Sequence, residues 1–233
     1  MPVSADLVQI SIAREVTYGA PSTTNTDWHI LPIVSEGVAA NAETTLSNLM
    51  NPNRQVLDSI LTNLTAEGNI DSEMVLCEAF EIILESAMAA EPGTPAPVVG
   101  EDPANIQDLD VGLLQKSFSI QKRFPDPVNE GQYLYQLVSG AVANTFGVVV
   151  SPAEAVTYSV GIMGKEFTSS TASVYAGDPV EPANSTVLRA PDSIDLQFGS
   201  VSGNPANAFD GETIASRCFG DFAFNINNNY RGI

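Results

Sequence analysis

Only one stretch of this sequence has the apolar spacing of a long helix, and most other apolar residues alternate as they do in strands. Within residues 74–90 the apolar side chains recur three to four positions apart, at Val75, Leu76, Ala79, Phe80, Ile83, Leu84 and Ala87. This spacing predicts a helix from Ser72 or Met74 to about Ala90, with Ser72 as its N-cap and Pro92-Gly93 as its stop. Three carboxylates are expected to point away from the apolar stripe: Glu78, Glu81 and Glu85. The stripe itself must be buried, and a sheet face is the expected partner.

Alternation of polar and apolar residues marks several strands in the rest of the chain. It is clearest at 116–124 and 155–163, and each is predicted to have one buried and one solvent-exposed face. The second of these places four apolar residues on one face: Val156, Tyr158, Val160 and Ile162. Further strands are expected at 7–13, 28–34, 68–74, 132–137, 141–150, 193–198 and 214–225, with 35–44 extended. Residues 56–65 fit a short helix or an irregular strand equally well, and 165–191 is expected to be mostly loop.

Turn residues separate these segments at intervals typical of all-β folds. With the single helix they predict a mainly β (α+β) fold, a β-sandwich or barrel of antiparallel strands with one flanking α-helix. The chain has 233 residues, 44% of them hydrophobic, which is enough for a core, and we expect a single domain over residues 1–233. Residues 47–58, rich in Asn, are predicted as an exposed loop, and 91–110, rich in Pro, Gly and acids, as an exposed linker loop.

The net charge of −19, from 28 Asp and Glu against 9 Lys and Arg, makes the chain strongly acidic. Binding to a duplex backbone depends on Lys and Arg that displace counterions, so the composition excludes a duplex-wrapping role. No run of about 20 apolar residues predicts a membrane span, and the first residues lack the basic segment of a secretory signal. Two cysteines, Cys77 and Cys218, make neither a disulfide framework nor a four-thiolate metal site, which is typical of a protein made in a reducing cytosol.

Residue types that carry catalysis or bind metals are sparse. His29 is the single histidine, which excludes a multi-histidine metal site, and its strand-like surroundings favour a partly buried strand residue over a catalytic one. Cys77 is expected to be a small buried residue on the helix. The acidic runs 69–73 and 108–110 lack the ligand spacing of a calcium loop and are interpreted as solvated loops. We predict no catalytic residue, cofactor or metal, and expect Lys122-Arg123 to form surface ion pairs or an inter-subunit contact.

Six motifs occur along nearly the whole chain: Ala13-Arg14-Glu15-Val16-Thr17-Tyr18-Gly19-Ala20-Pro21, Arg54 to Asp58, Gly68-Asn69-Ile70-Asp71-Ser72-Glu73, Phe118-Ser119-Ile120-Gln121-Lys122-Arg123-Phe124, Ser159–Gly164 and Asn227-Asn228-Asn229. In their order and spacing they resemble the tail tube proteins of long-tailed bacteriophages. Gln121 stands where that family usually has a glutamate. Members of the family often continue beyond the Asn-rich segment, whereas this sequence stops at Ile233.

The resemblance implies a structural subunit of a virion tail, assembled in the host cytoplasm, and not an enzyme. Such proteins form rings, usually hexameric, that stack head to tail into a hollow tube through which DNA passes. It also implies that an N-terminal arm (1–13) and an inter-ring loop (41–58) connect stacked rings, that the helix 74–90 packs on the outer face or between subunits, and that edge strands pair with a neighbour.

The partners implied by the resemblance are other copies of the chain and the tape measure, tail terminator and baseplate proteins. DNA would slide past an acidic lining without specific binding, because carboxylates repel its phosphates. No membrane partner is expected.

Two other interpretations stay open on the sequence alone. The chain is compatible with another virion component, either a tail terminator or a capsid decoration protein, since these are also β-rich. From a different class, an acidic calcium-dependent binding module accounts for the charge. The N-terminal arm and the loop 41–58 favour stacking, and therefore the tail tube.

Overall fold

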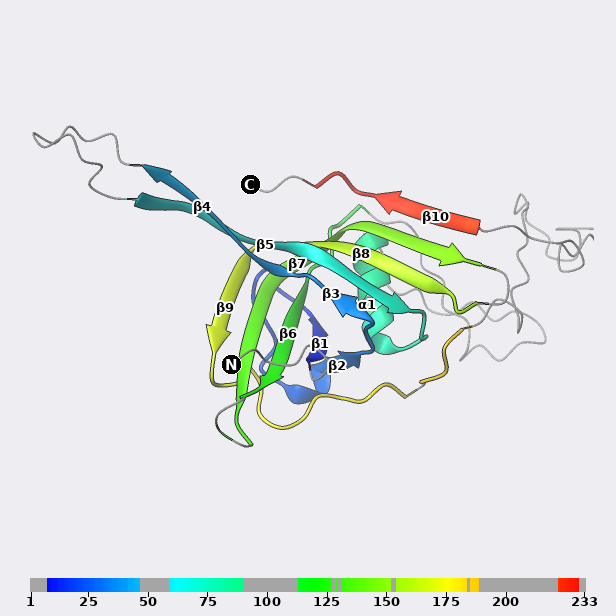
Figure 1. The fold of residues 1–233 in the computed structure, drawn as a ribbon, viewed down its shortest axis with the longest axis horizontal. Coiled ribbons are helices and arrows are strands. Elements are labelled where there is room, and N and C mark those ends of the chain that lie inside the picture. Colours follow the sequence, from blue (N-terminus) through cyan, green and yellow to red (C-terminus); the bar gives the residue numbers. More distant parts are fainter. Residues whose placement is uncertain are drawn as a thin grey trace, which may run out of the picture.

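A computed structural model of the chain describes residues 8–46, 59–89, 113–126, 129, 131–151, 154–183, 185–188 and 222–230. Its elements are β1 (Gln9–Arg14), a 3-10 turn (Asn25–Asp27), β2 (Trp28–Leu31), β3 (Ser35–Glu36), β4 (Ala39–Leu46), β5 (Ser59–Glu73), α1 (Glu78–Met88), β6 (Phe118–Pro125), β7 (Tyr133–Val150), β8 (Thr157–Gly164), β9 (Glu166–Ser170) and β10 (Phe222–Asn227). The expected mainly β fold with one flanking helix is confirmed: the described strands form one open antiparallel sheet, and α1 packs against it (Figure 1).

Strand β7 organises this sheet because it pairs along both of its edges. Its first half lies between β6 and β9, and its second half lies between β10 and β8. From β7 the sheet continues through β6 and β1 to β2 on one side, and through β8 and β5 to β3 and β4 on the other. At the change of partners Gly140 has a φ of +63°, and a Cβ there would lie 2.8 Å from the Cβ of Lys165. Only glycine fits this position without strain.

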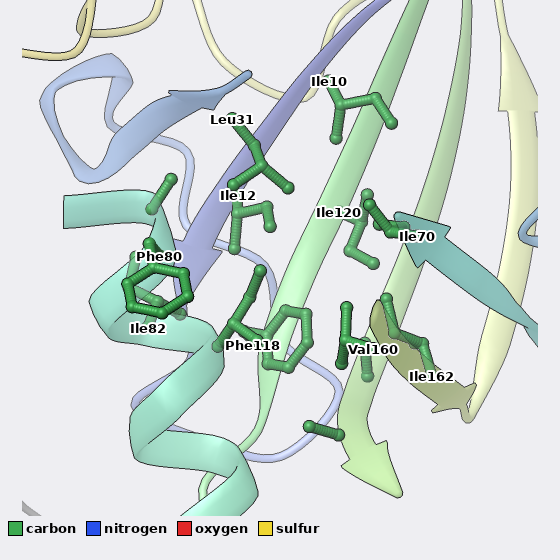
Figure 2. Packing of buried hydrophobic residues seen from close by; sticks show 14 of the residues in the cluster. Ile10, Ile12, Leu31, Ile70, Phe80, Ile82, Phe118, Ile120, Val160 and Ile162 are labelled. Carbon is green, nitrogen blue, oxygen red and sulfur yellow. The ribbon is translucent and has the colours of Figure 1, made fainter. Parts of the chain in front are cut away.

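The core lies between α1 and the inner side of the bent sheet. Figure 2 shows Phe80 and Ile82 of α1 facing Ile12 of β1 and Phe118 of β6. The Phe80 ring also lies 5.1 Å from the Tyr158 ring, centroid to centroid. The apolar face predicted for residues 155–163 is confirmed, because all four of its members are buried: Val156, Tyr158, Val160 and Ile162. Burying one large apolar side chain contributes about 1.5–3 kcal/mol, so this seam is a main source of stability.

The helix is shorter than the sequence predicts. Ser72 is not its N-cap, because it lies in β5 and its hydroxyl donates to the Pro32 carbonyl at 2.8 Å. Met74 is also outside the helix, and its N–H donates to the Val156 carbonyl at 2.7 Å. The helix begins at Glu78, after Cys77 in the N-cap position, and ends at Met88 before the left-handed Ala89. The predicted stop at Pro92-Gly93 lies outside the described residues.

Glu85 was expected to point away from the core, and this expectation is wrong. Its carboxylate is buried and accepts two hydrogen bonds from Arg14, from Nε at 2.9 Å and from Nη2 at 2.7 Å. The remaining Nη1 of Arg14 donates to Glu78 at 2.9 Å. These carboxylates, Glu85 above all, raise the pKa of Arg14, so the guanidinium stays charged. The paired fork ties the middle of α1 to β1.

The predicted wet face of residues 116–124 is also wrong, because both faces of β6 are covered over Phe118–Lys122. Phe118 and Ile120 face the core, while Gln121 is covered by the segment 173–175. The Gln121 side chain donates through Nε2 to the Ser173 hydroxyl at 3.0 Å and accepts through Oε1 from the Val174 N–H at 3.0 Å. The neutral amide of Gln121 therefore acts both as a hydrogen-bond donor and as a hydrogen-bond acceptor at this site.

We predict that Gln121→Glu destabilises the protein by about 2–4 kcal/mol at pH 7, because it buries a carboxylate whose hydrogen-bond partners at the amide, Ser173 and Val174 among the described residues, are neutral. Burial raises the pKa of such a carboxyl above its unfolded value, so the loss relative to wild type should shrink as the pH falls towards 4. Urea denaturation of both proteins at pH 4.5 and 7.5 measures this. A pH-independent difference would contradict the burial argument.

Other strand predictions are corrected as well. The ambiguous residues 56–65 belong to β5 from Ser59 onward, residues 132–137 and 141–150 are parts of the single strand β7, and β9 occupies part of the expected loop 165–191. Residues 9–13 of the expected N-terminal arm 1–13 form the paired strand β1. The predictions for 47–58, 91–110 and 193–198 fall outside the described residues, as does most of 214–225, where β10 begins only at Phe222.

Candidate assembly and channel surfaces

One face of the sheet is left uncovered by the described residues across six strands, and we call it the open face. Side chains on it alternate with the core-facing side chains of the same strands, as the pleat requires. Its members are Ser35 of β3, Ala39, Asn41 and Glu43 of β4, Glu67, Asn69, Asp71 and Glu73 of β5, Thr157, Ser159, Gly161 and Met163 of β8, Thr145, Gly147 and Val149 of β7, and Ala223, Asn225 and Asn227 of β10. All are exposed or half-buried. On β5, β7 and β8 the opposite face holds the core, with Ile70, Phe146 and Val160 among its members.

The open face is polar and carries charge of one sign. Its described members include four carboxylates, Glu43, Glu67, Asp71 and Glu73, and no Lys or Arg. The Ser35 hydroxyl donates to Asp71 at 2.9 Å. At one end a shallow groove of about 240 Å³ runs between Val34, Val149 and Asn225. Polar and acidic side chains therefore predominate on this face, with Val149 and Met163 as its large apolar members.

The hairpin of β4 and β5 projects beyond the rest of the sheet (Figure 1). In the projecting part β4 pairs only with β5, in register from Ala39 opposite Glu67 to Leu46 opposite Ser59, with a bulge at Glu43. Residues 39–45 are all exposed. The outer edge of β4 therefore presents backbone donors and acceptors that no described strand uses, which is typical of an edge that pairs with another chain. The tip of the hairpin, 47–58, lies outside the described residues.

A buried ion pair holds the base of this hairpin. Lys122 was expected at the surface, but its side chain is only 3% exposed and its Nζ lies 2.5 Å from Glu36. The same Nζ donates to the Val38 carbonyl, and Glu36 accepts from the Val38 N–H at 3.2 Å. Across from this corner a Cβ on Gly68 would lie 2.3 Å from the Gly37 carbonyl oxygen, so the two backbones meet as closely as glycine allows. The corner between β3 and β4 is therefore fixed from both sides.

The Glu15 carboxylate organises the region around the first motif. Its Oε2 accepts from the Gly19 N–H at 2.7 Å and from the Ser117 hydroxyl at 2.8 Å. Its Oε1 accepts from the Gly140 N–H at 2.7 Å and from the Ser119 hydroxyl at 2.5 Å. One side chain thus joins the turn after β1, the start of β6 and the bend of β7. The role of this glutamate is structural.

The Asn-rich motif near the other end of the chain has a similar structural role. The Asn228 side-chain amide donates to the Ala87 carbonyl and to the Ala143 carbonyl, each at 2.9 Å. Ala87 is in the last turn of α1, where carbonyl groups lack partners within the helix. Asn228 therefore links the end of α1 to β7, and it accounts for an asparagine at this place in the sequence.

Two of the residues singled out as reactive groups, His29 and Cys77, line one pocket beside the start of α1. His29 is a half-buried residue of β2, as predicted. Cys77 is buried at the start of α1, and burial raises the pKa of its thiol, which keeps it in the unreactive protonated form. Arg123 forms a 3.5 Å ion pair with the exposed Asp178, as expected of a surface pair. The acidic run 69–73 is strand rather than loop, and 108–110 lies outside the described residues.

In the part of the chain that the structure describes, no group of three His, Cys, Asp or Glu side chains is placed to hold a metal ion. Within the same residues, α1 is too short to reach across a bilayer, and no other helix is long and apolar enough to do so.

Comparison with known proteins assigns the family. The family model described as phage tail tube protein matches residues 5–232, nearly the whole chain, and the chain belongs to this family. It is accordingly a structural component of the virion tail and not an enzyme, as the sequence motifs implied. The match also sets aside the calcium-dependent binding module. No curated protein matches the chain.

Solved structures with a similar arrangement come from several tail-like assemblies. The chain is similar to the tube-terminating cap of the anti-feeding prophage, with 12% identity, a TM-score of 0.43 and coverage of 74% of this chain and 93% of that one. It is also similar to the SPP1 tail tube, with 11% identity, a TM-score of 0.43 and coverage of 73% and 80%. A chain of the PVC sheath–tube complex, from an extracellular contractile injection system, gives 9% identity, a TM-score of 0.38 and coverage of 73% and 93%.

Proposed function

We propose that this tail tube protein forms stacked rings, six copies to a ring, and that the open face lines a hollow acidic channel through which DNA is delivered to the host. The assembly belongs to a long-tailed, siphovirus-like phage. The observation that carries the proposal is the open face itself, which has four carboxylates and no described Lys or Arg. A phosphate backbone gains nothing from such a wall and is repelled by it, so DNA passes without sticking.

The remaining surfaces have places in the same assembly. Copies in a ring complete one another's sheets through the edges at β4 and β10, each of which pairs with one strand of its own chain. Rings stack through residues 41–58, of which 41–46 belong to β4 of the projecting hairpin and not to the expected loop, and through the part of the arm 1–13 that precedes β1. Helix α1 packs on the core side of its own sheet, opposite the open face, and in this proposal it lies on the outer wall of the tube.

The partners in this proposal are those that the family resemblance implies. A tape measure protein occupies the channel before DNA enters it, and terminator and baseplate proteins close the two ends. DNA is a passing partner without a specific site, and the tube itself uses no cofactor. These components are assembled in the host cytoplasm.

The assembly is tested by negative-stain microscopy and sedimentation of the purified protein. Rings of six copies, or tubes with a central hole, are expected. A monomer that persists at high protein concentration, or a ring with a different number of copies, would contradict the proposal.

Charge reversal tests the channel lining. In the variant Asp71→Lys/Glu73→Lys the tubes should form normally, because both side chains are exposed. Genome delivery from phage carrying it should be slowed about tenfold or more, because the new ammonium groups bind phosphates. A matched control is Asp27→Lys/Asp178→Lys, which changes the charge equally at two exposed carboxylates away from the open face. Potassium release from infected cells measures delivery, and equal rates for the two variants would contradict the lining.

A further inference from the structure

A pocket of about 260 Å³ lies where the start of α1 meets β2 and the segment 180–183. It lies on the helix side of the sheet, since it is lined by residues of α1, and none of its residues belongs to the open face. Apolar side chains form much of its wall, and two of them are unusually open to solvent, Leu76 at 52% and Val180 at 39%. Exposed apolar side chains grouped in a concave site are typical of docking surfaces.

The charges around this pocket have one sign. Glu78, Glu81 and Glu181 line it together with His29, and no Lys or Arg does. Glu78 is paired with Arg14 at 2.9 Å, and Glu181 is exposed on the described segment that ends at 183. An apolar wall with carboxylates at its rim fits a segment that combines apolar side chains with a basic one.

The sequence has one long internal segment with this composition outside the described residues. The segment 47–58 contains Arg54 against the single acid Asp58, together with Leu49, Met50, Val56 and Leu57. The segment 90–112 has five acids and no base, and 189–221 has five acids against two arginines. Both of these are repelled by the rim, so charge complementarity selects 47–58.

The same chain cannot supply this segment to its own pocket. The described ends of the hairpin, Leu46 and Ser59, pair at the far end of β4 and β5, and Figure 1 shows this end pointing away from α1 and β2. The twelve residues 47–58 must return from Leu46 to Ser59 at that end, since the two are partners in the register. In a head-to-tail stack, however, the projecting end of one copy lies beside the body of the next.

We propose that the pocket at the start of α1 receives the segment 47–58 of a copy in the adjacent ring, with Arg54 beside Glu181 and the apolar residues of the segment against Leu76 and Val180. The inference rests on the stacking in the proposed function and identifies the surface that each hairpin tip binds. It makes the contact heterologous, so every ring offers tips on one side and pockets on the other.

Charge-swapped variants test this contact. Arg54→Glu and Glu181→Arg should each reduce the fraction of rings found in stacks by about tenfold, because each places like charges together. The double variant Arg54→Glu/Glu181→Arg should restore most of the stacking. Glu166→Arg, an exposed carboxylate in β9 away from the pocket, is the matched control and should stack as wild type does. Thermal melting of the unassembled proteins checks that all variants fold.

The outcomes separate the contact from the assembly that it serves. Single variants that still form rings but do not stack, with rescue by the double variant, support the contact. Normal stacking in both single variants, or no rescue, overturns the contact and leaves the rings and channel in place. A wild-type protein that forms no rings overturns the proposed function and this inference together.

Discussion

Replacing Glu15 by alanine is expected to cost about 3–5 kcal/mol of unfolding free energy, the largest loss that any single carboxylate in the described residues should show. The variant removes the acceptor of four hydrogen bonds at once. The two hydroxyl groups can turn to other acceptors, but the Gly19 and Gly140 N–H groups are fixed by the backbone. Each of them loses its acceptor at the point where three segments of chain meet.

The substitution removes contacts at one place, but it should lower the stability of the whole protein. Gly140 lies where β7 changes partners, so a weakened bend affects the pairing of β6 and of β8 together. Urea denaturation of the unassembled protein, followed by circular dichroism, measures the loss. Glu15→Gln keeps one acceptor oxygen and should lose about half as much. Glu154→Ala, at an exposed carboxylate, is the control and should change stability by less than about 0.5 kcal/mol. A similar small change in Glu15→Ala would contradict the role given to this side chain.

Replacing Lys122 by methionine is expected to cost about 3 kcal/mol, because it leaves the Glu36 carboxylate unpaired in a site where only 18% of its side chain is exposed. The Val38 carbonyl loses its donor as well. Methionine has a similar length and no charge, so packing is largely kept. The loss should therefore report the electrostatic part of the contact.

The second variant of this pair removes the other charge. Lys122→Met/Glu36→Gln should recover about half of the loss, because no unpaired charge then remains near the core. Lys165→Met is the control: its ammonium lies 5.3 Å from the centre of the Tyr18 ring on an exposed side chain, and its loss should stay below about 1 kcal/mol. Additive single losses in the double variant would show that Lys122 and Glu36 do not act as a pair.

The Lys122 variant also bears on assembly, since the Glu36–Val38 corner sets the direction of the hairpin. Ring stacking should fall in Lys122→Met even at temperatures where the protein stays folded. Normal stacking in folded Lys122→Met would show that the hairpin is directed by β5 alone.

The sequence predicted best where a local pattern decides the structure. The alternation of Val156, Tyr158, Val160 and Ile162 fixed one face of β8, and the centre of the helix followed from its apolar spacing. It predicted poorly where a distant segment decides. Glu85 and Lys122 read as surface residues, and each is buried because a partner far along the chain, Arg14 or Glu36, supplies the opposite charge.

The start of the helix shows the same limit. Ser72 has the chemistry of an N-cap, but strand pairing with β8 extends β5 through that residue and delays the helix to Glu78. The covered second face of β6 was missed for a related reason, because the segment 173–175 that covers Gln121 has no regular pattern of its own.

The candidate surfaces were predicted in part. The family motifs indicated a tail tube protein, which the family match confirmed. The motifs included Glu15 and Asn228, but they did not indicate which contacts these two side chains make. The open face was not assigned, although the polar residues Glu67, Asn69, Asp71 and Glu73 already follow a two-residue spacing. Which side of β5 faces the core depends on its register with β8, and register is a property of the folded sheet.

Strand β7 gives the subunit a mechanical property. Its 18 residues run unbroken through both halves of the sheet, with a ladder of hydrogen bonds along each edge. A pull directed along this strand loads many of those bonds in shear at the same moment, so they must break together and not one by one. A subunit built in this way resists a pull along β7 far better than a pull that separates the strands one bond at a time. Tension applied to one half of the sheet is transmitted to the other half with little extension.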